Sequence, residues 1–149
     1  MEFLSTLMND LHQLEWLGAF VARVSVGLLF ALSGGGKLFV AEKGKEMQET
    51  LRKAGVPSPE LSAKILSTIE FAFGVLLTVG FLTPLCCIML IGVMAGALIT
   101  TILPGIKADS FIAWLATFLY LPEVLYLVIL IWLLLSGPGR LSVDYLLMS

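Results

Sequence analysis

The 149-residue chain is poor in the residue types from which metal centres are usually built. It has one histidine, His12, and two cysteines, Cys86 and Cys87, too few for a tetrahedral zinc site or a bis-histidine haem site within this chain. Charged residues make up 13% of the sequence, about half the share found in soluble domains, and form no basic stripe. We therefore expect no metal, no haem and no nucleic-acid partner.

A phosphate-binding loop is also missing, although residues 31–39 read ALSGGGKLF. Such a loop needs glycine, four residues and then Gly-Lys-Ser/Thr. Ala31 occupies the first glycine position, Leu38 occupies the hydroxyl position, and no strand pattern precedes the run. We expect the glycines to loosen the end of a membrane helix, with Lys37 at the interface.

Hydrophobic residues are abundant, at 58% of the chain, and they form blocks long enough to cross a bilayer, which takes about 20 residues. No Lys or Arg precedes Arg23, so we expect the first block to remain as an anchor rather than act as a secretory signal. The pattern predicts a single domain over 1–149, an all-α integral membrane bundle of four antiparallel helices. Their expected ranges are about 16–36, 59–82, 84–103 and 112–136.

Local signals refine these helices. A short amphipathic helix is expected at about 42–54, in the first loop. Thr83 and Pro84 predict a helix start with Thr83 as the cap. The spacing of Gly92 and Gly96 predicts close helix packing. Pro122 either kinks the last helix or marks its true start.

Lysine and arginine are unevenly divided between the two faces of the predicted bundle. The face with the termini has only Arg140 outside the membrane, which we expect at the interface. This asymmetry predicts a multi-pass protein of a bacterial cytoplasmic (inner) membrane, with the loops inside and both termini outside. The residues on the loop face are Lys37, Lys43, Lys45, Arg52, Lys53, Lys64 and Lys107.

Three stretches resemble the DoxX-like family of small bacterial membrane proteins. They read RVSVGLLFALSGGGKLF, GVPSPELSAKILSTIEFAFGVLLTVGFLT and GPGRLSVDYLL. The resemblance covers most of the chain in one register. It implies four membrane helices, a lipid bilayer, a protein partner or homo-oligomer, and association with respiratory or redox complexes. Some members look like subunits of quinone-reducing thiosulfate oxidoreductases, and others accompany thiol-oxidation or oxidative-stress proteins.

Three ionisable residues fall inside the predicted helices: Arg23, Glu70 and Glu123. Counted from the face bearing the termini at 1.5 Å per residue, they lie roughly 10, 18 and 20 Å deep. We expect one buried cluster, either a site for a proton or a quinone head group, or a structural ion cluster that fixes helix register. Glu123 has a further alternative, as a cap for a helix that starts at Pro122.

Other polar positions carry narrower expectations. Cys86 and Cys87 are either redox thiols, capable of a strained disulfide, or small apolar residues of a membrane helix. His12 is expected to be exposed. Ser142 and Asp144 are expected to cap a terminal turn or to dock a partner.

These observations predict a redox-associated membrane subunit, at most one part of a membrane oxidoreductase. It would anchor a partner or contribute to quinone binding in a respiratory or thiol/sulfur-oxidising complex. One alternative is a small carrier or channel-like protein whose polar route is lined by Arg23, Glu70 and Glu123. Another is a structural assembly subunit of a larger complex.

Overall fold

The computed structural model describes residues 2–148, and within this range every regular element is a helix. Three helices are long and apolar enough to cross a membrane, and there are four if the bent pair Phe111–Leu119 and Pro122–Ser136 forms one span. This confirms the predicted all-α membrane fold. In chain order the elements are α1 (Glu2–His12), α2 (Glu15–Phe39), α3 (Ala41–Lys53), α4 (Pro59–Val79), α5 (Thr83–Ala97), the π-helix η1 (Leu98–Ile102), the 3-10 turn η2 (Leu103–Gly105), α6 (Phe111–Leu119), α7 (Pro122–Ser136) and α8 (Val143–Met148).

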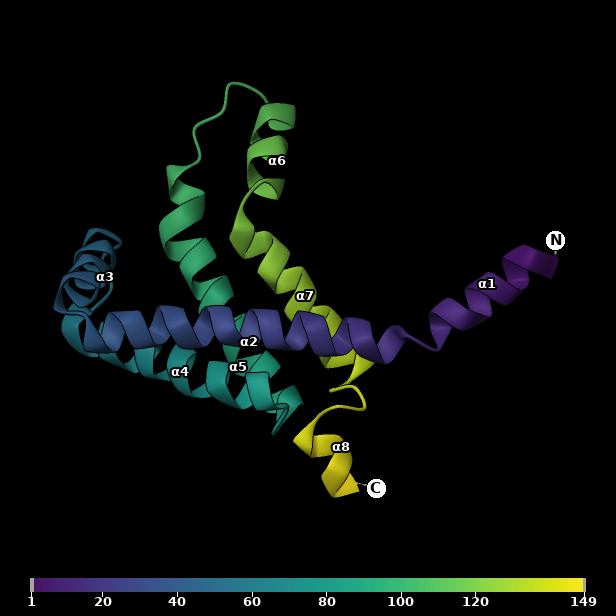
Figure 1. The fold of residues 1–149 in the computed structure, drawn as a ribbon. Coiled ribbons are helices and arrows are strands. Elements are labelled where there is room, and N and C mark those ends of the chain that lie inside the picture. Colours follow the sequence, from purple (N-terminus) through teal and green to yellow (C-terminus); the bar gives the residue numbers. More distant parts are fainter. Residues whose placement is uncertain (1, 149) are drawn as a thin grey trace.

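Helices α2 and α4 lie antiparallel and side by side, with the most extensive packing in the bundle (Figure 1). Glycines let the two backbones touch, as small residues do in membrane helix pairs. A Cβ at Gly27 would lie 2.5 Å from Thr78 Oγ1, and one at Gly34 would lie 2.7 Å from the Ser67 carbonyl oxygen. The glycine run therefore does not loosen α2. The helix continues to Phe39, beyond the predicted end at 36.

Helix α5 differs from the prediction in its glycines. A Cβ at Gly92 or Gly96 would meet no atom within 4 Å, so neither glycine mediates close helix packing. The reason is that this side of α5 faces a cavity rather than a neighbouring helix. The regular helix ends at Ala97 and gives way to η1, a wider helical turn of the kind often found at functional sites.

The last apolar block is broken. Helices α6 and α7 meet at a bend of 62°, so the continuous helix predicted over 112–136 is wrong. Pro122 is the first residue of α7, which confirms the alternative in which it marks the true helix start. Proline has no N–H to donate and a preset φ, so it fits the first helical position and interrupts any helix that precedes it.

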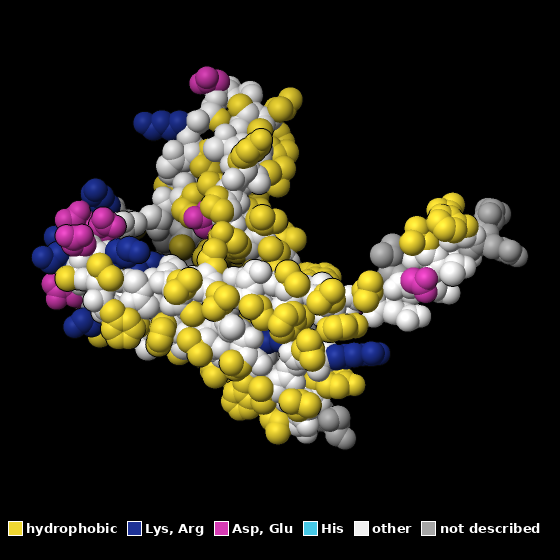
Figure 2. Space-filling view, in the orientation of Figure 1, with side chains coloured by type: hydrophobic (Ala, Val, Ile, Leu, Met, Phe, Trp, Pro, Cys, Tyr) yellow, Lys and Arg dark blue, Asp and Glu magenta, His cyan; other side chains and the backbone are white. Residues whose placement is uncertain are grey.

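Two helix pairs share one core. Helices α5 and α7 pack together and lean away from the α2–α4 pair (Figure 1). Helix α3 lies across one end of α2 and α4, and Leu51 is buried there, which confirms the predicted amphipathic helix. Both signs of charge gather over α3, whereas hydrophobic side chains are spread widely over the rest of the visible surface, with only a few further charges (Figure 2). The buried core consists of Val26, Phe30, Leu77, Cys86, Cys87, Leu90, Leu130 and Leu133.

Candidate functional site

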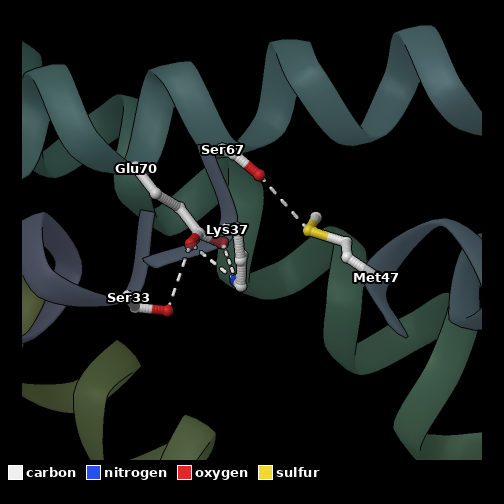
Figure 3. A network of polar contacts seen from close by, with 5 residues as sticks. All are labelled: Ser33, Lys37, Met47, Ser67 and Glu70. Atoms are coloured by element: carbon white, nitrogen blue, oxygen red, sulfur yellow. Dashed lines mark hydrogen bonds and ion pairs between the residues drawn. The ribbon is translucent and has the colours of Figure 1, made fainter. Parts of the chain in front are cut away.

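An ion pair joins α2 to α4 near α3. The Nζ of Lys37 donates to both oxygens of Glu70, at 2.9 Å to Oε1 and 2.6 Å to Oε2. The hydroxyl of Ser33, one turn before Lys37, donates to Oε2 at 3.4 Å. The three side chains point toward one another in Figure 3. Glu70 is only 4% exposed, so this lysine supplies the opposite charge that a buried carboxylate requires.

The pair lies in the wall of a cavity of about 580 Å³ between α2, α3, α4, α5 and η1. Its lining is mostly apolar, with Gly92 and Gly96 supplying open space on α5. Polar groups enter from η1 as well. Thr100 donates its hydroxyl to the Gly96 carbonyl at 2.7 Å and lies 3.2 Å from the Thr101 hydroxyl. An apolar cavity of this size with a few convergent polar groups is the usual form of a small-molecule site.

Helix α3 closes one side of this cavity and is tied to α4. The buried hydroxyl of Ser67 donates to the Met47 sulfur at 3.5 Å (Figure 3). Lys43 and Glu46, also on α3, line the cavity. The formal charges of the lining therefore cancel, because Lys37 and Lys43 balance Glu46 and Glu70.

Arg23 does not join this pair, so the predicted cluster of Arg23, Glu70 and Glu123 is wrong as geometry. Arg23 is 1% exposed and donates instead to backbone carbonyls at the opposite end of α4. Its Nη1 donates to the carbonyl oxygens of Leu77 at 3.0 Å and Thr78 at 2.6 Å, and its Nη2 donates to the carbonyl of Leu141. The end of a helix offers carbonyls without intrahelical partners, and these accept from Nη1 and Nη2, whereas the buried Nε has no hydrogen-bond partner among the described residues.

The C-terminal segment completes this arginine junction. Gly80 adopts a left-handed conformation, with φ +74°, and a Cβ there would lie 2.5 Å from Arg23 Nη1 and 2.6 Å from Ser142 Cβ. Asp144 donates its backbone N–H to the Gly80 carbonyl at 2.9 Å. Ser142 accepts from the Tyr145 N–H at 3.1 Å, which confirms its predicted capping role at α8.

Asp144 caps α5 from the other end of the chain. Its carboxylate accepts hydrogen bonds from the N–H groups of Leu82 and Thr83, each at 2.7 Å. The prediction that Thr83 caps this helix is therefore wrong, since Thr83 is the first helical residue. Burial raises the pKa of Asp144, but the hydrogen bonds from Thr83 and Leu82 and the nearby Arg23 guanidinium outweigh it. The resulting pKa of Asp144 lies below its ordinary value.

Glu123 and the two cysteines lie apart from the Lys37–Glu70 pair. Glu123 is half-buried in the first turn of α7, where the positive end of the helix dipole favours a carboxylate, but α7 has no side-chain capping hydrogen bond, so the capping alternative is not confirmed. Its side chain makes no hydrogen bond or ion pair within residues 2–148. Cys86 and Cys87 are unpaired and fully buried in the core, and Cys86 Sγ donates to the Phe81 carbonyl at 3.4 Å. This burial favours their role as small apolar residues over that of redox thiols.

The residue that sequence reasoning misplaced is Lys37. We expected it at the interface, whereas its side chain is mostly buried against Glu70. A usable signal was present, because Ser33 and Lys37 are four residues apart and share a helix face. The tightly packing Gly34 lies on the same stretch, where α2 approaches α4. Because α2 and α4 run antiparallel, Lys37 is the cation of α2 that lies level with the buried Glu70 of α4.

Comparison with known proteins gives a consistent result. The DoxX family model matches residues 18–103, which include every residue that lines the α2–α5 cavity. An uncharacterized membrane protein of Mycobacterium tuberculosis, Rv3486, is 30% identical over 127 residues, covering 82% of this chain and 76% of the relative. No solved structure matches the chain. Since the family model spans more than half of the sequence, the protein belongs to the DoxX family of membrane proteins.

Proposed function

We propose that the protein is a redox-associated membrane subunit that binds the head group of a quinone in the cavity between α2, α3, α4 and α5. The observation that carries this proposal is the Lys37–Glu70 pair in the wall of a mostly apolar cavity of about 580 Å³. The setting is a bacterial cytoplasmic membrane with the loops inside, as the lysine distribution predicts.

The size and charge of the cavity support an uncharged, largely apolar ligand. Pockets for such ligands commonly measure about 300–1,000 Å³. Two lysines and two glutamates line this one, so their formal charges cancel and no net field selects an ion. A quinone head group is planar, uncharged and apolar apart from two carbonyl acceptors, which matches this lining.

The donor set also fits. Lys37 supplies N–H donors for one quinone carbonyl, and Ser33 lies beside it. Because Thr100 already donates to the Gly96 carbonyl, the Thr101 hydroxyl donates to Thr100 at 3.2 Å, and it would exchange this bond for one to the second quinone carbonyl. Glu70 holds Lys37 in place and offers an oxygen that can hold a proton at the cavity wall. A bound quinone would supply two-electron, two-proton redox chemistry, and a partner protein anchored by this chain would exchange the electrons.

The carrier alternative has less support. It requires Arg23, Glu70 and Glu123 to line one continuous route. Glu70 lines the cavity near α3, whereas the donors of Arg23 are committed to carbonyls at the other end of α4. Arg23 and Glu70 therefore lie in separate parts of the bundle and do not line one route.

Binding of a short-chain quinone to the purified protein tests the proposal. Glu70→Gln keeps the shape of the side chain but removes the charge that holds Lys37 in position at the cavity wall. We expect it to weaken quinone binding about tenfold, the loss that follows from one charge-assisted hydrogen bond of about 1.4 kcal/mol. Glu60→Gln is the matched control, because Glu60 is exposed at the start of α4, outside this cavity.

Thermal unfolding in detergent should show that both variants are folded. If the parent binds no quinone at saturating concentration, the cavity has another ligand. If Glu70→Gln binds as tightly as Glu60→Gln, the ion pair is structural and the protein is better described as an assembly subunit.

A further inference from the structure

A second cavity, of about 650 Å³, lies at the opposite end of α2 from α3. It is formed by the elbow between α1 and α2, the last turns of α7 and the segment that leads into α8. Both ends of the described chain lie toward this side of the bundle (Figure 1). Helix α2 begins and helix α7 ends beside this cavity. Because both helices are apolar, the cavity lies at the level of a membrane–water boundary.

Aromatic side chains line this terminal cavity. Trp16 enters it from the first turn of α2, Trp132 from α7 and Tyr145 from α8. Tryptophan and tyrosine favour the head-group level of a bilayer, because each has an apolar body and one polar group. Trp132 is 44% exposed, and Val128 and Leu125, one and two turns back along α7, are each 57% exposed, so an apolar surface continues from the cavity along α7.

The polar groups of the terminal cavity include one cation that is not committed to a carboxylate. His12 and Glu15 are both exposed, as expected for His12, and they engage one another directly across the elbow. Arg140 lines the same cavity, and its guanidinium has no hydrogen bond or ion pair to any residue described in the structure. Its five donors are therefore available, in the planar fork that matches phosphate oxygens.

We propose that the terminal cavity binds the phosphate head group of an anionic phospholipid. Arg140 holds the phosphate, Trp16 and Trp132 flank the glycerol region, and the acyl chains follow the apolar surface of α7. The continuity between the cavity and that exposed apolar surface favours a lipid over a free phosphate ion.

Helix α1 fits this arrangement. Phe3, Leu4 and Leu7 lie on one side of it, with exposed fractions of 78%, 61% and 43%. Hydrophobic atoms cover one side of this projecting helix in Figure 2, and acidic atoms lie on another. Amphipathic helices can bind in the interface plane of a bilayer with their apolar face toward the lipid. Helix α1 would therefore cover the same leaflet that supplies the lipid.

Native mass spectrometry of the full chain, released from detergent, tests this proposal. The probes are phosphatidylglycerol, phosphatidylcholine and inorganic phosphate. We expect one phosphatidylglycerol to be retained in preference to phosphatidylcholine, with no competition from inorganic phosphate. Arg140→Gln should lower this retention about fivefold, equivalent to about 1 kcal/mol, the contribution of one arginine near an anionic head group.

Lys107→Gln is the matched control, since Lys107 is an exposed cation in the loop before α6 and does not line this cavity. Trp132→Leu should also lower retention, because it removes an interfacial ring while the chain keeps its charge. Equal loss in Lys107→Gln would overturn the proposal, as would equal retention of phosphatidylcholine. Competition by inorganic phosphate would show that the cavity recognises the anion alone and not a lipid.

Discussion

Replacing Arg23 with methionine should destabilise the bundle by about 3 kcal/mol and release the C-terminal segment. The methionine keeps most of the apolar stem but removes three hydrogen bonds to carbonyls. Each bond from a charged donor contributes about 1.5–3 kcal/mol, which would give an upper limit near 9 kcal/mol. The limit is not reached, because the Leu77 carbonyl keeps the N–H of Gly80 at 3.0 Å and the buried guanidinium no longer has to be desolvated.

Thermal unfolding in detergent measures this loss, at about 2–4 °C for each kcal/mol in a chain of this size. Limited proteolysis should cut near Leu141 in the variant before the helices are attacked. Double replacement provides the sharper test. Arg23→Met and Asp144→Asn should add less than fully, because both residues act at the α4–α5 turn.

Arg23→Met and Glu70→Gln should add fully. Glu70 lies seven residues before Leu77, roughly 10 Å along α4, and its own partner is Lys37. Coupling between Arg23 and Glu70, or a loss below about 0.5 kcal/mol for Arg23→Met, would refute the assignment of Arg23 to the junction.

Three further predictions concern packing, pH and orientation. Gly74→Ala should destabilise the fold by a few kcal/mol, since a Cβ there would lie 2.9 Å from the Gly27 carbonyl oxygen, whereas Gly92→Ala should be neutral or stabilising in the same unfolding assay. The pKa of Asp144 is lowered on folding, so its contribution to stability is fully present above its unfolded pKa of about 3.9 and is lost as pH falls through the lower folded value. Asp144→Asn should remove this dependence below about pH 4, and an unchanged acid unfolding profile would contradict it. In intact cells, Gln48→Cys should be shielded from a membrane-impermeant thiol reagent while Ser5→Cys reacts, and the reverse pattern would invert the predicted orientation.

The helices that were predicted correctly are those with strong local signals. Pro59 begins α4 as its position predicted, and the polar segment at 42–54 forms α3 because its few apolar residues share one face. The break at Pro122 was visible as an alternative, since proline either kinks or starts a helix. The sequence alone does not choose between these outcomes, because the choice depends on how α6 packs.

Local sequence patterns could not predict which groups each buried charge contacts. Depth counting placed Arg23 near two carboxylates, but depth says nothing about which side of a helix a side chain occupies. The small-residue spacing at Gly92 and Gly96 was equally ambiguous. Gly92 and Gly96, four residues apart, face open space on α5, whereas close packing occurs at Gly27 and Gly34, which are seven residues apart. Only the packing of the helices in the bundle distinguishes a glycine at a helix contact from a glycine beside a cavity.

The capping of α5 by Asp144 places a constraint on biosynthesis. The Leu82–Thr83 turn leaves the ribosome roughly sixty residues before the carboxylate that satisfies its N–H groups. Until then, Arg23 also lacks the Leu141 carbonyl, so the nascent bundle carries an incompletely satisfied cation and an uncapped helix. A chain that stops before residue 141 would expose both defects to membrane quality control. The segment that carries Leu141 and Asp144 is thus made after the helices whose polar groups it satisfies.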